Sequence, residues 1–296
     1  MKKKILYALG FTLLAFGFYY IYRTITNQIA VKKHREWVAT LTHSASKNVQ
    51  ILKDTITIDY LNEKRTVALY LPENYAKDTA HYSVVYFLDG QSLFDQKIQE
   101  DTEWQVDEVL DSLGVLKKEQ SIIVGIYCSE KNRMTEYKPF PSTRWYSDKV
   151  VSGDKHADWI VKQLKPWVDA RFRTKKEANA TTIGGASLGG LMSYYMLMHY
   201  PDVFGRGIVF SPSFWVNEVV YTLHEKNKNV FNQKIYFNAG EHETPTVESV
   251  LKMQDILIKH GVPKENIKTD IEIGEGHGHK AWEKGFKKAY PWIITD

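Results

Sequence analysis

The stretch that decides the fold is "TIGGASLGG", residues 182–190. At its centre is the pattern G-x-S-x-G, which begins at Gly185 and has Ser187 in the middle. This pattern allows a serine to stand on a sharp turn between a strand and a helix, with its hydroxyl exposed. A short β-branched run, residues 181–184, precedes the turn, and an apolar stretch with helical character, residues 190–199, follows it. The sequence therefore predicts a strand-turn-helix unit that presents Ser187.

The same five letters also arise by chance in glycine-rich loops, where the serine has a structural role only. Two features favour a nucleophile here. The residues around Ser187 are small, as a tight and strained turn requires, and the flanking strand and helix are both predicted. We therefore interpret Ser187 as a catalytic nucleophile.

The rest of the chain alternates between strand and helix patterns. Runs rich in β-branched and aromatic residues predict strands, and apolar residues at helical spacing predict helices. Pro166, inside one helical pattern, should kink that helix or mark a start. The predicted strands are 55–59, 65–72, 81–90, 120–127, 181–184, 207–212, 234–240 and 267–273, and the predicted helices are 158–172, 190–204, 246–261 and 280–290. This order predicts an α/β fold, a mostly parallel central sheet with helices on both faces, formed by one domain over residues 36–296.

Charge and cysteine content exclude several classes of protein. The 296 residues include 39 Lys and Arg against 35 Asp and Glu, but residues 1–35 hold seven of the basic residues and no acidic one. The remainder carries a net charge of about −3, which argues against a nucleic-acid-binding body. Cys128 is the only cysteine, so neither an intrachain disulfide nor a cysteine-based metal site is possible.

The N-terminus resembles an export signal. Lys2, Lys3 and Lys4 precede eighteen residues without a charge, Ile5–Tyr22. A membrane-spanning helix needs roughly 20 apolar residues, with about 17 as the lower end. We interpret residues 1–35 as an uncleaved signal anchor followed by a basic stalk, with the catalytic body outside the cytoplasmic membrane, in the periplasm or beyond the cell. A cleaved signal peptide and a buried helix are the alternatives.

A serine nucleophile needs a base and an acid that orients the base. In hydrolases built around such a turn, they follow in the order Ser, acid, His. After one predicted strand, "FNAGEHET" offers Glu241 and Glu243, and after the last strand "GEGHGH" offers His277 and His279. Both segments lie at carboxyl ends of strands, where sites of open α/β sheets are found. An ordinary surface loop is the alternative for each, and a histidine pair without acidic or cysteine partners is a poor metal site.

With these features the chain resembles the putative-esterase family of α/β-hydrolases. That family includes siderophore (enterobactin) esterases, feruloyl and other carbohydrate-ester esterases, S-formylglutathione hydrolases and mycolyltransferases. The resemblance runs from about Ile56 to Trp292. The segments that carry it are "VVYFLDGQ", "IVGIYCSEKNRMTEYKPF", "GGASLGGLMSYYMLMHYPDVFGRGIVFSPSFW", "FNAGEHE" and "GEGHGHKAW".

The resemblance implies roles for individual residues. The family histidine often precedes a Trp by five residues, which favours His277 over His279. The family acid often follows the strand-end glycine by three residues, which favours Glu243, with Glu241 and Glu248 as alternatives. One oxyanion donor should be the amide of Leu188, directly after the nucleophile. The resemblance assigns the other donor to the amide of Gln91.

Residues that follow predicted strands, taken together with the resemblance, suggest the substrate. Arg133 should lie near the edge of the site, where it could bind an anionic or catecholate-type group or be simply solvated. Phe214 and Trp215 could form an aromatic wall, and further aromatic candidates are Trp104, Trp145 and Tyr146. A siderophore-type or carbohydrate-linked ester is therefore expected, with no metal or organic cofactor. An acyltransferase and a non-catalytic binding protein of the same fold are the alternative functions.

Overall fold

The computed structural model describes residues 2–116, 118–143 and 150–295, with side chains from residue 15 onward. The chain divides into two compact units, residues 1–43 and residues 44–296. The first unit consists of one long helix, α1 (Lys2–Thr40). The second unit contains every strand of the described chain and all the candidate site residues.

Most of the anchor expected over residues 5–22 lies outside the described side chains, because these begin at residue 15. Within the part that is described, no helix combines the length and the apolar character needed to cross a membrane. The anchor is therefore not confirmed.

The second unit is built on an eight-stranded sheet with the order β1-β2-β4-β3-β5-β6-β7-β8. The first two strands pair antiparallel, β2 also pairs antiparallel with β4, and the strands from β4 to β8 are parallel to one another. The predicted α/β class with a mostly parallel sheet is confirmed. The strands are β1 (Val49–Ile58), β2 (Glu63–Tyr70), β3 (Val84–Leu88), β4 (Ile122–Ile126), β5 (Thr181–Ala186), β6 (Arg206–Phe210), β7 (Lys234–Gly240) and β8 (Ile267–Glu272).

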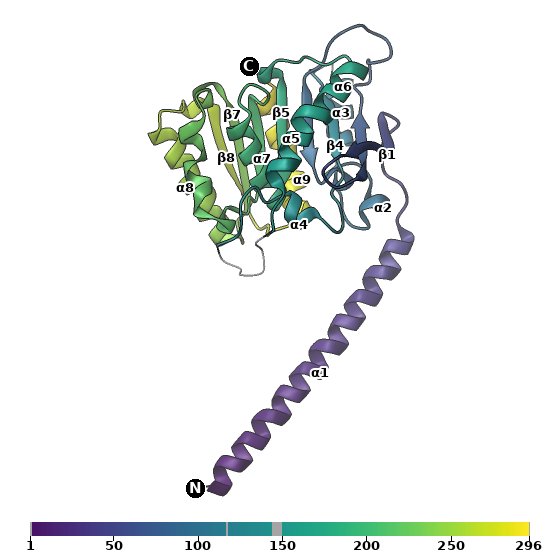
Figure 1. The fold of residues 1–296 in the computed structure, drawn as a ribbon. Coiled ribbons are helices and arrows are strands. Elements are labelled where there is room, and N and C mark those ends of the chain that lie inside the picture. The colour runs from purple at the N-terminus through teal and green to yellow at the C-terminus, as the bar shows by residue number, and fades with distance from the viewer. Residues whose placement is uncertain (1, 117, 144–149, 296) are drawn as a thin grey trace. The chain divides into compact units, whose positions relative to one another are not determined.

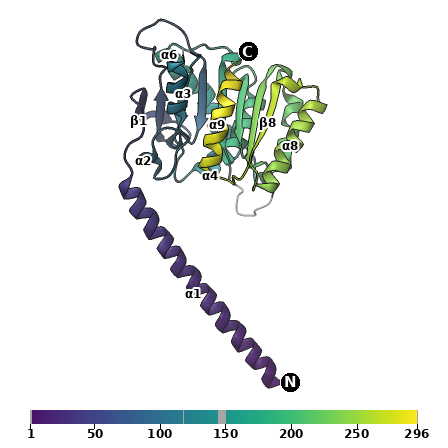
Figure 2. The ribbon, with the colours of Figure 1, turned by 180° about the vertical axis from the view of Figure 1, so that it is seen from behind.

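Helices cover both faces of the sheet, as Figures 1 and 2 show from opposite sides. One face packs against α5 (Gly153–Trp159), α6 (Lys165–Arg171), α7 (Leu188–His199) and α8 (Thr244–Lys259). The other face packs against α3 (Val106–Val115) and α9 (His279–Ile294). Among the described residues of this unit, the two remaining α-helices are single turns, α2 (Gln96–Gln99) and α4 (Arg133–Glu136).

The buried strands form this sandwich because their successive side chains point to opposite faces. In β3, Val84, Tyr86 and Leu88 belong to the core under α7, whereas Val85 and Phe87 belong to the core under α9. All five side chains are buried. Strands that are covered on both sides are continuous apolar runs rather than alternating ones, which is why β3 could be recognised but its two faces could not.

Pro166 begins a helix after an irregular turn. The predicted helix 158–172 is divided into α5, a π-helical segment (Ile160–Leu164) and α6, and Pro166 lies in the first turn of α6. Proline has no amide hydrogen to donate to the preceding turn. The residue before it, Lys165, donates its amide hydrogen to the carbonyl of Ile160, which is the hydrogen bond of a π turn.

The parallel arrangement brings several chain segments to one edge of the sheet. Strands β3 to β8 all end at this edge, since parallel strands share their direction. From β3 the chain continues to β4, which lies on one side of β3, and later enters β5, which lies on the other side of β3. A crevice forms where the direction of winding changes, and ligands of open α/β sheets bind there.

Candidate active site

The turn after β5 holds Ser187 in a strained backbone conformation. Its φ of 59° and ψ of −122° lie in a region that non-glycine residues rarely adopt. The Ser187 amide donates to the carbonyl of Phe210 on β6, at 3.0 Å. This hydrogen bond ties the turn to the neighbouring strand and supports the strained geometry.

The glycines around Ser187 are needed because the backbone segments approach closely. A Cβ atom at Gly185 would lie 2.7 Å from the carbonyl oxygen of Gly189. A Cβ atom at Gly190 would lie 2.6 Å from the carbonyl oxygen of Phe210. Both distances are shorter than any tolerated contact, and both contacts are with backbone. The G-x-S-x-G-G sequence thus reflects packing of α7 against β5 and β6.

His277 lies in the loop between β8 and α9, in contact with Ser187. Its Nε2 atom is 3.0 Å from Ser187 Oγ, and its Nδ1 atom is 2.5 Å from Glu243 Oε2. The edge of the imidazole ring meets the Trp282 indole at a centroid distance of 5.2 Å and an interplanar angle of 87°. Trp282, five positions after His277 and on α9, therefore supports the imidazole ring.

Glu243, the residue that precedes α8, has a buried carboxylate with three partners. Besides His277, it accepts from Ser211 Oγ at 2.7 Å and from the Gly240 amide at 2.9 Å. Burial acts to raise the pKa of this carboxyl. The hydrogen bonds from His277, Ser211 and Gly240 outweigh burial and hold the pKa below its usual value. Glu243 is therefore an ionised acceptor next to the imidazole.

Ser211 was not found by sequence reasoning. It is buried directly after β6, where its hydroxyl donates to Glu243 and accepts from the Trp282 indole N–H at 3.0 Å. A lone serine after a strand has no distinctive signature. The only sequence signal was its place in "SPSFW", the end of one of the segments that carry the family resemblance.

The two other candidate acids lie elsewhere. Glu241 is exposed, and its carboxylate accepts from the Gly274 amide at 2.9 Å. Glu248 is exposed on α8. Of the three candidates, Glu243 is the one whose carboxylate contacts His277.

The alternative histidine, His279, forms part of the wall of a pocket. The Trp104 indole donates to its Nδ1 atom at 3.0 Å, and the Gln99 amide lies 3.0 Å from its Nε2 atom. Burial lowers the pKa of His279, so the neutral ring is favoured. Because Nδ1 accepts, the single proton of the neutral ring is on Nε2, which faces the side-chain amide of Gln99.

The pocket in front of Ser187 has a volume of about 280 Å³. Arg133 and Asp89 form one side of it. The Arg133 guanidinium donates to both carboxylate oxygens of Asp89, from Nε at 2.7 Å and from Nη2 at 2.8 Å. The lining residues are Asp89, Gln91, Ser92, Gln99, Trp104, Arg133, Ala186, Ser187, His279 and Trp282. Arg133 thus lies at the site as expected, but much of its charge is already paired.

Gln91 lies in a single 3-10 turn, Gly90–Ser92, directly after β3. Its side-chain oxygen accepts from the Cys128 amide at 3.2 Å, and its side-chain nitrogen lies 3.2 Å from Cys128 Sγ. A Cβ atom at Gly90 would lie 2.2 Å from the carbonyl carbon of Gly125 on β4, so the turn is packed directly on that strand. These contacts fix the main chain of Gln91. Leu188, the other predicted amide donor, is the first residue of α7.

The expected aromatic wall is only partly present. Phe214 is fully buried in the core, with its ring 5.2 Å from that of Tyr194 and 6.0 Å from that of Tyr221, so the prediction that it binds substrate is wrong. The physical reason is that it continues the apolar face under α7 and α8. Trp215 is 42% exposed and is not among the lining residues of the pocket. Trp104 does line it, whereas Trp145 and Tyr146 lie outside the described residues.

Comparisons with known proteins identify the family of the chain. Residues 58–293 match the family described as "Putative esterase". A protein of Bacillus subtilis (strain 168), the uncharacterized protein YbbA, is 27% identical over 241 residues, which are 77% of this chain and 92% of that protein.

Three solved structures have the same fold at low sequence identity. The BES protein of Bacillus cereus has a TM-score of 0.68 at 20% identity and covers 85% of this chain and 96% of its own. The siderophore hydrolase EstA of Aspergillus nidulans has a TM-score of 0.65 at 14% identity, with coverages of 84% and 95%. A ferulic acid esterase has a TM-score of 0.64 at 16% identity, with coverages of 83% and 98%. Since the family match spans most of the chain, this protein belongs to the putative-esterase family of α/β-hydrolases and is an ester hydrolase.

Proposed function

We propose that the protein hydrolyses a carboxylic ester with Ser187 as nucleophile, His277 as general base and Glu243 as the acid that orients the histidine. One observation carries the proposal: an unbroken hydrogen-bonded chain runs from Ser187 Oγ through both nitrogens of His277 to a buried carboxylate. The three residues follow three different strands, β5, β7 and β8. Local sequence constraints alone would not bring them together.

The proposed steps follow from the donors and acceptors of this chain. Glu243 accepts a hydrogen bond from the N–H at His277 Nδ1, which keeps the proton there and leaves a lone pair on Nε2 that can take the proton of Ser187 Oγ. The Ser187 oxygen attacks the ester carbonyl, and His277 then protonates the leaving alcohol. Water, activated by the same histidine, releases the acid from the acyl-enzyme. The ionised Glu243 stabilises the imidazolium that forms in both steps.

The oxyanion of the tetrahedral intermediate would be stabilised by the amides of Leu188 and Gln91. Leu188 is at the N-terminus of α7, where free amides and the helix dipole favour negative charge. The Gln91 turn is held rigidly against β4 and Cys128, so its amide would be positioned before the substrate binds.

We further propose that the ester is siderophore-type or carbohydrate-linked. Two indoles, Trp104 and Trp282, line the pocket together with the hydrogen-bonding groups of His279, Gln99 and Arg133. This combination suits an ester whose acyl or alcohol part carries a hydroxylated ring. Arg133 keeps guanidinium N–H groups beyond the two that Asp89 accepts, so it can donate to such a ring.

The first experiment compares the wild type with Ser187→Ala on a panel of esters. The panel holds short p-nitrophenyl esters, a feruloyl ester, an acetylated sugar and a tri-catecholate lactone. Ser193→Ala is the matched control, because Ser193 is a buried serine of α7 whose hydroxyl has no partner within the described chain. We expect Ser187→Ala to lose on the order of 10⁴–10⁶ of kcat/KM and Ser193→Ala to lose little.

The outcomes separate the candidate functions. The ester with the highest kcat/KM identifies the substrate class. Formation of a new ester with an added alcohol, in place of free acid, would indicate an acyltransferase. A folded wild type that turns over none of the esters with or without an alcohol would contradict the proposal and favour a binding protein.

We also propose that residues 1–35 attach the enzyme to a membrane and that the hydrolase unit lies outside the cytoplasm. The support is Lys2–Lys4, the uncharged run that follows, and exposed aromatic side chains of α1 such as Phe18 and Tyr20. Cell fractionation tests the attachment, with residues 44–296 as the soluble control. Protease added to intact spheroplasts tests the side. An intact full-length chain in the soluble fraction would contradict attachment.

A further inference from the structure

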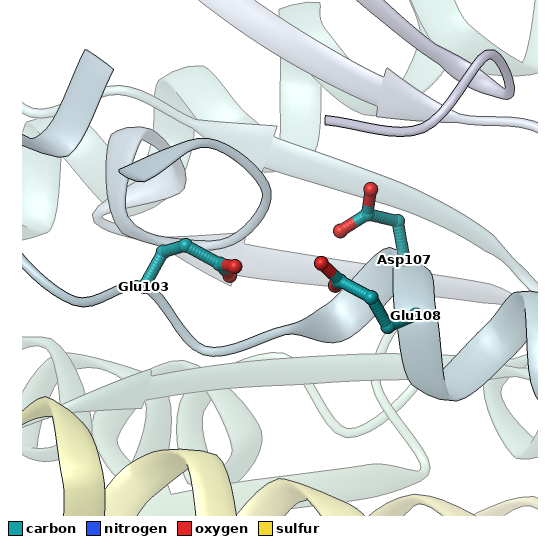
Figure 3. Close-up of side chains that lie close together, drawn as sticks. All are labelled: Glu103, Asp107 and Glu108. Atoms are coloured by element: carbon teal, nitrogen blue, oxygen red, sulfur yellow. The ribbon is translucent and has the colours of Figure 1, made fainter. Parts of the chain in front are cut away.

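Three carboxylates gather beside the pocket at the beginning of α3. One oxygen each of Glu103, Asp107 and Glu108 lies within 4.8 Å of the other two. Figure 3 shows the side chains of Glu103 and Glu108 directed towards one another, with Asp107 beside them. Glu103 and Asp107 are buried, whereas Glu108 is exposed. The cluster is therefore closed on the protein side and open to solvent at Glu108.

The buried part of the cluster is short of partners. Asp107 is fully buried, and its Oδ2 atom accepts from the Ser46 amide at 2.6 Å. Its Oδ1 atom has no hydrogen-bond partner within the part of the chain that the structure describes. One oxygen of Glu103 accepts from the Gln105 amide. A buried carboxylate oxygen without a partner is costly, so it points to a group that the described part of the chain does not supply.

The acids Glu108 and Glu283 act on Glu103. A basic side chain nearby, Lys287, contacts Glu283 at 2.6 Å and the Gln105 side-chain oxygen at 3.1 Å, so its charge is paired with Glu283. Three carboxylates this close together, two of them buried, need a positive charge to balance them.

We propose that Glu103, Asp107 and Glu108 bind a hard divalent cation of the Ca²⁺ or Mg²⁺ class. Carboxylate oxygens are the ligands that these ions prefer. Calcium binds oxygen at about 2.3–2.6 Å, so two ligands of one ion are at most roughly 5 Å apart, a limit that the observed spacing satisfies. Water on the open side, at Glu108, completes the coordination. This site could not be expected from the sequence, because the spacing E-x-x-x-D-E from Glu103 to Glu108 matches no known cation-binding pattern.

The site would support the wall of the pocket. Glu103 is followed by Trp104, whose indole lines the pocket and donates to His279. A cation held by Glu103 and by the first turn of α3 would fix the loop on both sides of this indole. The inference does not depend on the proposed triad, and its test uses no ester.

The test is terbium luminescence on the full chain after chelator treatment. Tb³⁺ replaces hard cations and emits when a nearby indole is excited, and Trp104 is adjacent to the site. We expect saturable emission that Ca²⁺ or Mg²⁺ displaces, and the more effective competitor identifies the cation. Glu108→Gln should weaken binding at least tenfold. Glu248→Gln, an exposed acid on α8, is the matched control and should leave the curve unchanged.

A thermal melt gives a second measurement. At a hundredfold excess over Kd, the cation should raise Tm by roughly 5–10 °C in the wild type and by clearly less in Glu108→Gln. Asp107→Asn keeps an acceptor for the Ser46 amide and should show the same loss. Identical titrations of Glu108→Gln and Glu248→Gln would overturn the proposal. So would a Tm that rises on acidification but does not respond to any cation, because protons would then balance the cluster.

Discussion

Glu243 has a role that its neighbours in sequence cannot take over, because only its carboxylate reaches both His277 and the buried Ser211. Glu243→Gln keeps the size and places an amide N–H or oxygen beside His277 Nδ1, so the charge and the preferred tautomer are lost. We expect kcat to fall by about 10⁴, with a small change in KM. Steady-state kinetics on the best ester check this. Glu241→Gln and Glu248→Gln should retain wild-type kcat, and a comparable loss in either would contradict the assignment.

The same carboxylate should make stability depend on pH. In the folded protein its pKa lies below its usual value, because three hydrogen bonds favour the ionised form over the effect of burial. An unfolded glutamate titrates near pH 4.3. The stabilisation is therefore fully present above about pH 5 and is lost as the pH falls through the folded pKa. Urea unfolding of the wild type and Glu243→Gln between pH 3 and 7 measures it. The difference in free energy of unfolding should shrink on acidification, and a constant difference would refute the linkage.

The candidate catalytic residues were easier to predict from the sequence than the residues that hydrogen-bond to the site. We could propose that Ser187, Glu243 and His277 meet, because they occur in this order along the chain and each follows a predicted strand. Ser211 and Gln99 were not identified, because a hydroxyl or an amide becomes a partner only when the fold brings it into position. Phe214 was assigned to the pocket on its position after a strand, but its burial depends on packing under α7 and α8.

At the scale of elements, the patterns predicted most strands and helices but not all their limits. The amphipathic pattern over 246–261 corresponds to α8, and Gly261, with a φ of 104°, follows its end. By contrast, α3 was not predicted, although it covers part of one face. Helix α9 continues through Pro291 to Ile294, beyond the predicted end at residue 290. Local propensity sets the type of an element, whereas packing on the sheet sets its ends.

The contact between α7 and β6 gives a prediction for this pair of elements. A methyl group at position 190 would meet the Phe210 carbonyl oxygen at 2.6 Å and Pro212 at 3.2 Å, so Gly190→Ala must move the helix. We expect a loss of about 1–3 kcal/mol in the free energy of unfolding, which exceeds any gain in helix propensity. Gly276→Ala is the control, because a Cβ atom there meets nothing within 4 Å. Urea unfolding compares the two, and equal stabilities would show that α7 is not tightly seated.

At the scale of the whole molecule, the parallel sheet is what assembles the site. The segments that follow five of the strands bring the site residues to one edge of the sheet. They are Asp89 and Gln91 after β3, Arg133 after β4, Ser187 after β5, Glu243 after β7 and His277 after β8. The sequence predicted strands and a parallel majority, but not that β3 lies between β4 and β5 or that β1 and β2 pair antiparallel at the margin. Strand order depends on pairing between distant segments, for which one sequence gives no direct signal.

The division of the chain at residue 43 leads to the last prediction. Residues 44–296 contain the complete sheet, both hydrophobic cores, the triad candidates and the carboxylate cluster. Removing residues 1–43 should therefore leave kcat/KM within about twofold of the full chain and Tm within a few degrees, because a domain with its own core folds alone. Kinetics and thermal melts on both forms, each purified in the same detergent, make the comparison. If the shortened chain is folded but its kcat/KM falls tenfold or more, the N-terminal unit takes part in catalysis and the site is incomplete without it.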